Sequence, residues 1–540
     1  MSKAFSSLLH RLTAIANQFD EERQGEKLEL LRACSAHSIP APKLLMRYAD
    51  VLLFLVSHPG NGALQKLAEK EMARLTRHLK QHGLKATYEN SGLPYSTTLS
   101  RFSYDIIDWM LHSGDVQLRF DSFTEESQDL NEVLKLSLPS LEREHTSAGY
   151  TYQELLEALQ VKAGQEVAFL IEQLSKFTSQ PLLKDYLFDS LDLYIRVSSS
   201  KKTFSKFYNT LSCPELYYHQ DLLKRFDTVE LINRPLPEAE EYTVSERESV
   251  LTCIKHSLVL TARETDPATF CDPDSLKVFR LERGISVAIY GMTANRQLPF
   301  ESYVGYTLFK NGFPAAYGGC WITGARSLFG INIFEPYRGG ESGFMMMQIL
   351  RVYRQVFGIT YFEVEPYQFG KDNPDGITSG AYWFYYRLGF RSTDKKLKAL
   401  AEQEMQKIKT RKEYRSSYKT LESFTDSYIA LELDKKVPPP MSYFTSRITS
   451  MIRKEYKGNR QLAEDKCMMA FLHEVKGLRL NSAPEIQVLK EMALIAKALG
   501  IKDRQLLHLL GDMVTAKTVD VYAYQKIQKR FCNHFVTKSF

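Results

Sequence analysis

The chain has 540 residues, of which 44% are hydrophobic and 25% are charged, and its formal net charge at pH 7 is +6. This length exceeds what one hydrophobic core supports and predicts two to four domains of ordinary soluble composition. A net charge this small for the length does not by itself indicate a nucleic-acid partner.

The cysteines and histidines show no spacing typical of a disulfide framework or a metal site. The seven cysteines are scattered without a CxxC pair, and the twelve histidines show no ligand pattern. The first residues, MSKAFSSLLHRLTAIANQF, are too polar for a secretory signal, and the apolar run 51–56 is far shorter than a membrane span. We therefore expect reduced thiols, no metal, no membrane span and a cytoplasmic protein.

Apolar residues recur at helical spacing through most of the first half of the chain. The predicted helices contain the apolar residues of 5–19, 44–55, 64–79, 106–111, 167–174 and 182–197. The run RPLPE at 234–238, which leads into an acidic stretch, is the best candidate for a linker. Residues 1–240 are therefore predicted to form a helical N-terminal region.

The central part of the chain changes to a mixture of strand and helix patterns. A helix is predicted over 245–262, and the runs 278–281 and 285–290 are typical of strands. Two further strand-like runs meet at the turn KNG, residues 310–312, where Asn-Gly signals a tight hairpin. These patterns predict the beginning of an α/β sheet.

A glycine-rich turn, RGGESG at 338–343, lies between the next strand and the next helix. The strand 326–334 ends at Glu335-Pro336, because proline cannot continue a ladder. The turn leads into an almost wholly apolar helix over 344–357, which Gly358 closes, and 359–365 is a further predicted strand. Such a turn places free backbone N–H groups at the positive end of a helix dipole, where phosphates bind well.

The remainder of the chain returns to helical patterns. A basic helical stretch covers about 394–415, and 428–433 is a predicted strand that closes the sheet before a second linker at 435–440. Two further helices are predicted over 486–499 and 506–514. The expected architecture is an α+β multidomain protein, with helical residues 1–240, a central α/β domain at 245–434 and a helical extension at 441–540.

This order of elements resembles the GNAT acyltransferase fold. In that family an Arg/Gln-x-x-Gly-x-Gly/Ala turn holds the pyrophosphate of acyl-coenzyme A. Arg338 and Gly343 match its first and last positions, and Glu341 stands in place of the middle glycine. The family's helix ending in Phe-Tyr-x-x-Leu-Gly-Phe, whose tyrosine lies near the coenzyme sulfur, is similar to FYYRLGF at 384–390.

The whole chain is also similar to an uncharacterised family of bacterial proteins. The segments that carry this resemblance are NSGLP at 90–94, YQFG at 367–370, SGAYWFY at 379–385 and LGFR at 388–391. The resemblance implies a central GNAT-like mixed sheet with helices, and no particular substrate.

The GNAT resemblance implies a donor site around the glycine turn. Its cofactor-binding residues would be Ile333, Phe334, Arg338, Gly339, Gly340, Ser342 and Gly343. A backbone N–H near Ile333 or Phe334 would stabilise the oxyanion. The Glu341 carboxylate suits a helix start but would repel a pyrophosphate unless Arg338 or a lysine neutralises it, so replacing it with glycine is expected to tighten binding.

Two tyrosines and three glutamates are candidates for proton transfer. Tyr385 would protonate the departing thiolate as a general acid, and Tyr386 is a weaker choice. Glu335, Glu363 or Glu365 would be the general base, and the last two are expected on one face of a strand, where they would raise each other's pKa. The alternatives are that the tyrosine belongs to an aromatic core and that the glutamates are solvated or salt-bridged.

The predicted function is acyl transfer from a thioester donor to an amine. The donor would be acyl-CoA or, if Glu341 excludes the nucleotide, an acyl chain on the phosphopantetheine of an acyl-carrier protein. Aminoacyl transfer from a charged tRNA is the first alternative, motivated by the basic stretch at 407–415. A non-catalytic scaffold that binds protein or nucleic acid is the second.

Overall fold

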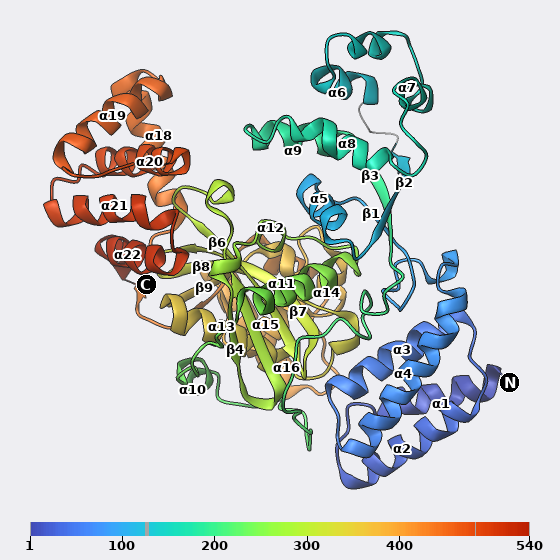
Figure 1. Cartoon of the computed structure of the whole chain (residues 1–540). Helices are drawn as coiled ribbons and strands as arrows, with labels where there is room; N and C mark the ends of the chain where they lie inside the picture. The colour runs from blue at the N-terminus through green and yellow to red at the C-terminus, as the bar shows by residue number, and fades with distance from the viewer. Residues whose placement is uncertain (1, 125–128, 481, 539–540) are drawn as a thin grey trace. The chain divides into compact units, whose positions relative to one another are not determined.

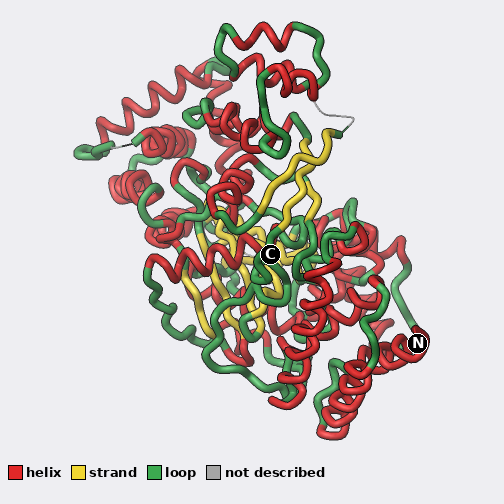
Figure 2. The backbone as a smooth tube through the Cα atoms, turned by 45° about the vertical axis from the view of Figure 1, so that its right-hand side comes forward, coloured by secondary structure: helices red, strands yellow, loops and turns green. Residues whose placement is uncertain are grey.

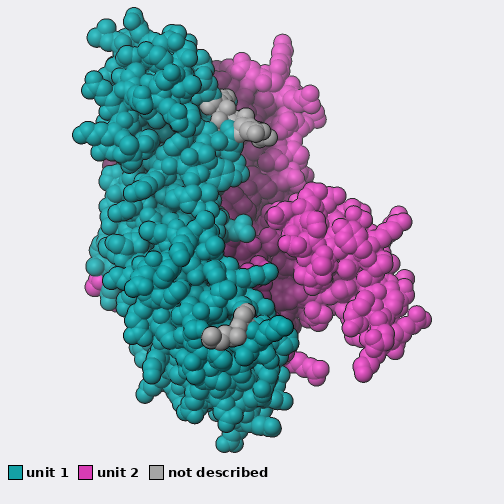
Figure 3. Space-filling model, turned by 90° about the vertical axis from the view of Figure 1, so that its right-hand side faces the viewer, with its two compact units in different colours: residues 1–222, 244–269, 310–314 teal, residues 223–243, 270–309, 315–540 magenta. Residues whose placement is uncertain are grey.

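The computed structural model describes residues 2–124, 129–480 and 482–538, and the chain forms two compact units. Unit 1 comprises Met1–Leu222, Val244–Thr269 and Lys310–Pro314, and unit 2 comprises Leu223–Thr243, Phe270–Phe309 and Ala315–Phe540 (Figure 3). Of the helices in the described ranges, none has both the length and the apolar character that crossing a membrane requires.

Unit 1 begins with four helices packed around one hydrophobic core. They are α1 (Ser2–Ile15), α2 (Glu21–Ala36), α3 (Pro42–Ser57) and α4 (Gly62–His82). The side chains of Asp20 and Asn61 accept backbone N–H groups at the starts of α2 and α4 and so cap these helices. The apolar spacing correctly predicted α1, α3 and α4. It did not predict α2, because the sequence of that helix is strongly charged.

A second core of unit 1 combines helices with a small antiparallel sheet. Its helices are α5 (Tyr104–Ser113), α6 (Leu130–Ser137), α7 (Tyr152–Ala158), α8 (Glu166–Ser175), α9 (Pro181–Ser190) and α11 (Val244–Val259), and the short α12 (Asp266–Thr269) follows in the same unit. Its strands, in yellow in Figure 2 like all strands, are β1 (Thr98–Ser100), β2 (Gln117–Phe123) and β3 (Leu193–Ser198), in the order β1-β3-β2.

The predicted helix over 182–197 was wrong in its last residues. The chain leaves α9 at Ser190 and enters β3, where buried and half-buried residues alternate from Leu193 to Ser198. This alternation with period two, together with the β-branched Ile195 and Val197, is typical of a strand. A window that also contained the apolar residues of α9 masked this change of period.

Unit 2 is built on a mixed eight-stranded sheet with helices around it, which confirms the predicted α+β class. The strands are β4 (Lys277–Arg280), β5 (Ile285–Tyr290), β6 (Ser302–Lys310), β7 (Phe313–Thr323), β8 (Arg326–Ile333), β9 (Tyr361–Val364), β10 (Arg391–Ser392) and β11 (Ile429–Glu432). Their order across the sheet is β10-β11-β9-β8-β7-β6-β5-β4. The strands β8 and β9 pair in parallel, whereas β7 with β8 and β9 with β11 pair antiparallel.

The hairpin between β6 and β7 forms where the Asn-Gly signal predicted it. Asn311 and Gly312 have φ angles of 45° and 83°. A two-residue turn of this type requires the left-handed region at both central positions, which asparagine and glycine tolerate best. The predicted strands 278–281, 285–290, 326–334, 359–365 and 428–433 also correspond to β4, β5, β8, β9 and β11.

Helices of two groups accompany the sheet in unit 2. The first group is α10 (Thr228–Asn233), α13 (Ser342–Phe357), α14 (Pro374–Thr378), α15 (Ala381–Arg387), α16 (Lys395–Thr410) and α17 (Tyr418–Ser423). The second is α18 (Met441–Tyr456), α19 (Arg460–Glu474), α20 (Ala483–Ala498), α21 (Arg504–Lys517) and α22 (Val521–Cys532), which stack on one another (Figure 1). A short ladder joins β12 (Lys436–Val437) to β13 (Thr537–Lys538).

The C-terminal helices belong to unit 2 and share a hydrophobic core, to which Phe300 also contributes. The buried Lys517 of α21 donates hydrogen bonds to the carbonyl oxygen of Glu301 at 2.7 Å and to the Ser302 hydroxyl at 2.9 Å. Tyr524 of α22 donates to the carbonyl of Phe300 at 2.6 Å. These contacts fasten α21 and α22 to the segment that enters β6.

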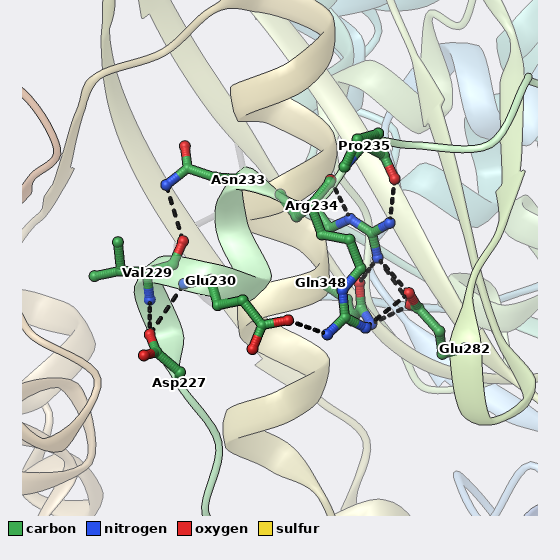
Figure 4. A network of polar contacts seen from close by, with 9 residues as sticks. Asp227, Val229, Glu230, Asn233, Arg234, Pro235, Glu282 and Gln348 are labelled. Atoms are coloured by element: carbon green, nitrogen blue, oxygen red, sulfur yellow. Dashed lines mark hydrogen bonds and ion pairs between the residues drawn. The ribbon is translucent and has the colours of Figure 1, made fainter.

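The predicted domain boundary at 240–245 does not coincide with the boundaries between the two compact units. The segment 223–243 belongs to unit 2, because the buried Arg351 of α13 donates to the carbonyl of Arg234 at 2.9 Å and pairs with Glu282 at 2.8 Å. Figure 4 shows Arg234, Pro235 and Glu282 meeting in this network. The proline-rich run therefore lies against α13 and is not a free linker.

The helix α11 belongs to unit 1, although it was predicted to open the central domain. Val259 and Leu260 at its end join the second core of unit 1. Asn209 of the same unit donates from its amide to the carbonyl of Cys253 at 2.8 Å. Composition alone did not reveal this exchange of segments between the two units.

Candidate functional site

The parallel strands β8 and β9 pair along only part of their length. Arg326, Ser327 and Leu328 pair with residues 361–363, and β8 continues to Ile333 beyond this pairing. β9 ends at Val364, before Pro366. The backbone edge of β8 beyond Leu328 is therefore not covered by β9, as expected for two strands that separate toward the glycine turn.

The glycine turn brings backbone N–H groups and one guanidinium together. A short 3₁₀ helix, η6 (Glu335–Tyr337), follows β8, and Gly339 adopts a φ of 76° before α13 begins at Ser342. The first N–H groups of α13 have no intrahelical partner, as at any helix start, and no side chain of the N-cap residue Glu341 caps them. The exposed Arg338 belongs to the same turn and donates from Nε to the carbonyl of Ile333 at 3.0 Å.

The Glu341 side chain points into the interior, where its charge is paired. Its side chain is fully buried and pairs with Arg283, whose Nη2 lies 2.6 Å from Glu341 Oε1. The same oxygen accepts the backbone N–H of Leu223 at 2.9 Å. The sequence suggested that this carboxylate would repel a pyrophosphate unless Arg338 or a lysine neutralised it, but its partner in the structure is Arg283, which is 58 residues away in sequence.

The two predicted oxyanion donors differ in what they contact. The N–H of Phe334 donates to the carbonyl of Ala315 at 3.0 Å and so belongs to the antiparallel ladder. Because strand N–H groups alternate in direction, the N–H of Ile333 points to the side of β8 that faces away from β7. The N–H of Ile331 points the same way and donates to the side-chain oxygen of Gln368 at 3.4 Å.

Tyr385, on α15, contacts the same Gln368 side chain. Its side chain is buried among the rings of Phe369, Phe384 and Phe390, and its hydroxyl donates to Gln368 Oε1 at 3.5 Å. Burial raises the pKa of the Tyr385 hydroxyl well above its usual value, and the charge of Glu365 raises it further. The hydroxyl is protonated at neutral pH, as an ordinary tyrosine is, and the raised pKa makes it a weaker acid.

Tyr386 has a different environment from its neighbour. It is half-buried, and the guanidinium of Arg391 lies 3.8 Å from the centre of its ring. Tyr382 and Trp383 of the same helix are buried against Phe424. Most of the aromatic block is therefore core packing, and Tyr385 is the member whose hydroxyl shares the Gln368 oxygen with the Ile331 N–H of β8.

The three candidate carboxylates are not equivalent. Glu363 forms an ion pair with Arg326 at 2.7 Å, which corrects the expectation that it would pair with Glu365 on one strand face. Pro366 ends β9 early, so Glu365 lies in the turn before η7 (Pro366–Phe369). Glu365 is half-buried and close enough to act electrostatically on Tyr385, whereas Glu335 is exposed at the start of η6.

Sequence reasoning missed two members of this group, Ile331 and Gln368. Gln368 belongs to the YQFG segment, which was used only to establish a resemblance, and Ile331 takes part through its backbone alone. Comparisons with protein families, with curated proteins and with solved structures found no match to the chain. What the site does must therefore be inferred from its own residues.

Proposed function

We propose that unit 2 is a GNAT-like acyltransferase that moves an acyl group from a thioester donor to an amine. One observation carries this proposal, which is that β8 and β9 separate directly before the uncapped start of α13. Separation of these two strands is the feature that opens the donor site in the family that the sequence resembles. The Tyr385 hydroxyl, which shares the Gln368 oxygen with the Ile331 N–H of β8, supports the same assignment.

The donor would place its phosphates on the turn 339–343 and its thioester beside β8. The first N–H groups of α13 and the Arg338 guanidinium both favour an anion at this position. The Glu341 charge opposes a pyrophosphate weakly, because Arg283 already pairs with it. Both acyl-CoA and the phosphopantetheine of an acyl-carrier protein supply the required thioester.

The transfer step can be written for these residues. The amine nitrogen attacks the thioester carbonyl carbon, a C–N bond forms, and the carbonyl oxygen takes the negative charge near the outward N–H groups of β8. The C–S bond then breaks, and Tyr385 gives its proton to the departing sulfur. Glu365 accepts the proton that the amine loses, and exchange through water returns a proton to Tyr385.

The first experiment is mass spectrometry of small molecules retained by the purified protein, followed by calorimetric titration with coenzyme A. Gly343→Ala is the test variant, because a Cβ at this position meets Leu388 only at 3.4 Å and the helix should still fold. A methyl group at the turn should weaken coenzyme A binding about tenfold or more by hindering the close approach of phosphate. Gly25→Ala in α2, where a Cβ has open space, is the matched control.

Equal affinities in the parent and in the Gly343→Ala variant would place the phosphate site elsewhere. Failure of any thioester or coenzyme to bind would favour the non-catalytic scaffold.

A basic surface favours aminoacyl transfer from a charged tRNA as the second candidate. The exposed cations on α16 and the turn after it are Lys395, Lys396, Lys398, Lys407, Lys409, Arg411, Lys412 and Arg415. The exposed acidic residues of the same stretch are only Asp394, Glu402 and Glu413. A nucleic-acid backbone is the kind of partner that such an excess of positive charge would attract.

The tRNA candidate predicts binding with a steep salt dependence. Fluorescence anisotropy of labelled tRNA at 50 and 200 mM salt should show a loss of affinity of about tenfold or more, and the double variant Lys409→Glu, Lys412→Glu should reduce the slope. Unchanged binding in this variant would mean that the basic stretch is only a solvated helix face.

A further inference from the structure

Gln368 occupies the uncovered edge of β8 with its own side chain. Its Oε1 accepts the N–H of Ile331 at 3.4 Å and the hydroxyl of Tyr385 at 3.5 Å. One amide oxygen is therefore the common acceptor for a backbone donor of β8 and for the candidate general acid. A bound donor would need the same two groups, the N–H for one of its carbonyl oxygens and the hydroxyl for its sulfur, so Gln368 and the donor compete for one position.

The hydrogen bonds of the Gln368 side chain are weak enough for a ligand to displace it. Both hydrogen bonds are longer than the usual 2.9 Å, so each is weak. Gln368 is half-buried, so part of its surface is already in contact with solvent. Its backbone is held by a 3.1 Å hydrogen bond from the Gln368 N–H to the carbonyl of Glu365 and by Pro366 at the start of η7. Rotation of the side chain alone would therefore uncover Ile331 and Tyr385.

Gly330 of β8 provides the space in which Gln368 lies. A Cβ at position 330 would meet Gln368 Nε2 at 3.5 Å, which is ordinary contact. A longer side chain at that position would collide with the amide. The glycine therefore leaves room beside β8 for one amide group, contributed either by the protein or by a ligand.

We infer that Gln368 is an internal placeholder that satisfies the open edge of β8 until the donor displaces it. This inference rests on the proposed acyl transfer, because it concerns access to the same site. Gln368 acts through Ile331 and Tyr385 and is a positioning residue. It reduces the affinity for the donor by keeping both hydrogen-bond donors engaged while the site is empty.

The test uses the full chain and pantetheine, which carries the thiol and the two amide carbonyls of the coenzyme without its phosphates. Gln368→Ala removes the competing oxygen, so calorimetry should show pantetheine binding about threefold to tenfold more tightly than in the parent, as expected for the loss of weak competing hydrogen bonds. Gln297→Ala is the matched control, since Gln297 is also half-buried and donates one hydrogen bond, to the carbonyl of Met292 at 2.7 Å.

Hydrogen exchange gives a second readout that a merely structural role would not reproduce. In Gln368→Ala the peptide that contains Ile331 should exchange faster than in the parent, and saturating pantetheine should restore its protection. Unchanged or weaker pantetheine binding in Gln368→Ala overturns the inference, as does binding to none of the variants or faster exchange that pantetheine does not reverse.

Coenzyme A in parallel titrations separates this inference from the proposed function. If coenzyme A binds no more tightly than pantetheine in the parent, the proposed phosphate site at 339–343 is refuted. A gain in pantetheine affinity in Gln368→Ala would still support the placeholder role of Gln368. If coenzyme A binds tightly and Gln368→Ala changes neither affinity, the placeholder role of Gln368 is refuted and the proposed donor site is supported.

Discussion

The buried pair between Glu341 and Arg283 predicts that Glu341→Gly destabilises the protein. Glu341 has no exposed side-chain area, and Arg283 retains only 13%. Removing the carboxylate leaves a buried guanidinium without this partner and deprives the Leu223 N–H of its acceptor. Loss of one member of a buried ion pair costs about 3–5 kcal/mol. Glycine itself is well tolerated where a helix begins, so this loss should dominate.

Arg283 makes the prediction testable by a double-mutant cycle. Its φ of 61° lies in the left-handed region, which glycine adopts without strain. The double variant Arg283→Gly, Glu341→Gly buries neither charge and should lose at least about 2 kcal/mol less than the sum of the single variants. Urea unfolding, followed by fluorescence, measures all four proteins.

A loss below about 1 kcal/mol in Glu341→Gly, or additive losses in the cycle, would refute the reasoning. The same variant also revises an expectation from the sequence. Glycine at 341 was expected to tighten coenzyme A binding, but the carboxylate already pairs with Arg283. The coenzyme affinity of the folded fraction should therefore change by less than about threefold.

Two further predictions concern Tyr385 and Lys27. Tyr385→Phe keeps the ring and loses one 3.5 Å hydrogen bond, so its melting temperature should change little. Acyl transfer should fall by about tenfold to ten-thousandfold, and equal turnover in Tyr385→Phe, Tyr386→Phe and the parent would contradict the general-acid role. Burial lowers the pKa of the Lys27 ammonium, which lies over the Phe19 ring, from 10.5 to about 8. Between pH 8 and 10.5 the unfolded chain then binds more protons than the folded chain, so the stability of the parent should rise with pH. Lys27→Met should gain on the order of 2 kcal/mol at pH 7 and lose this rise, and parallel pH profiles in thermal unfolding would contradict the assignment.

The sequence by itself determined those features that depend on neighbouring residues. The Asn311-Gly312 turn, the end of β8 before Pro336 and the end of α13 at Gly358 were all predicted, because backbone conformation at each place depends on one or two residues. The strands β4 to β9 could likewise be read from short apolar runs. Tyr385 was chosen within its aromatic block because the surrounding residues resemble a family motif, and its catalytic role stays a prediction.

Tertiary structure alone decided where side chains point and which segments meet. The direction of the Glu341 carboxylate depends on Arg283, and the occupant of the β8 edge depends on Gln368, 37 residues from Ile331. The assignment of 223–243 to unit 2 likewise depends on Arg351. Contacts between residues so far apart leave no periodic pattern in the chain. The charged or amide side chains that make them are equally common on a solvated surface, so their type does not show where they point.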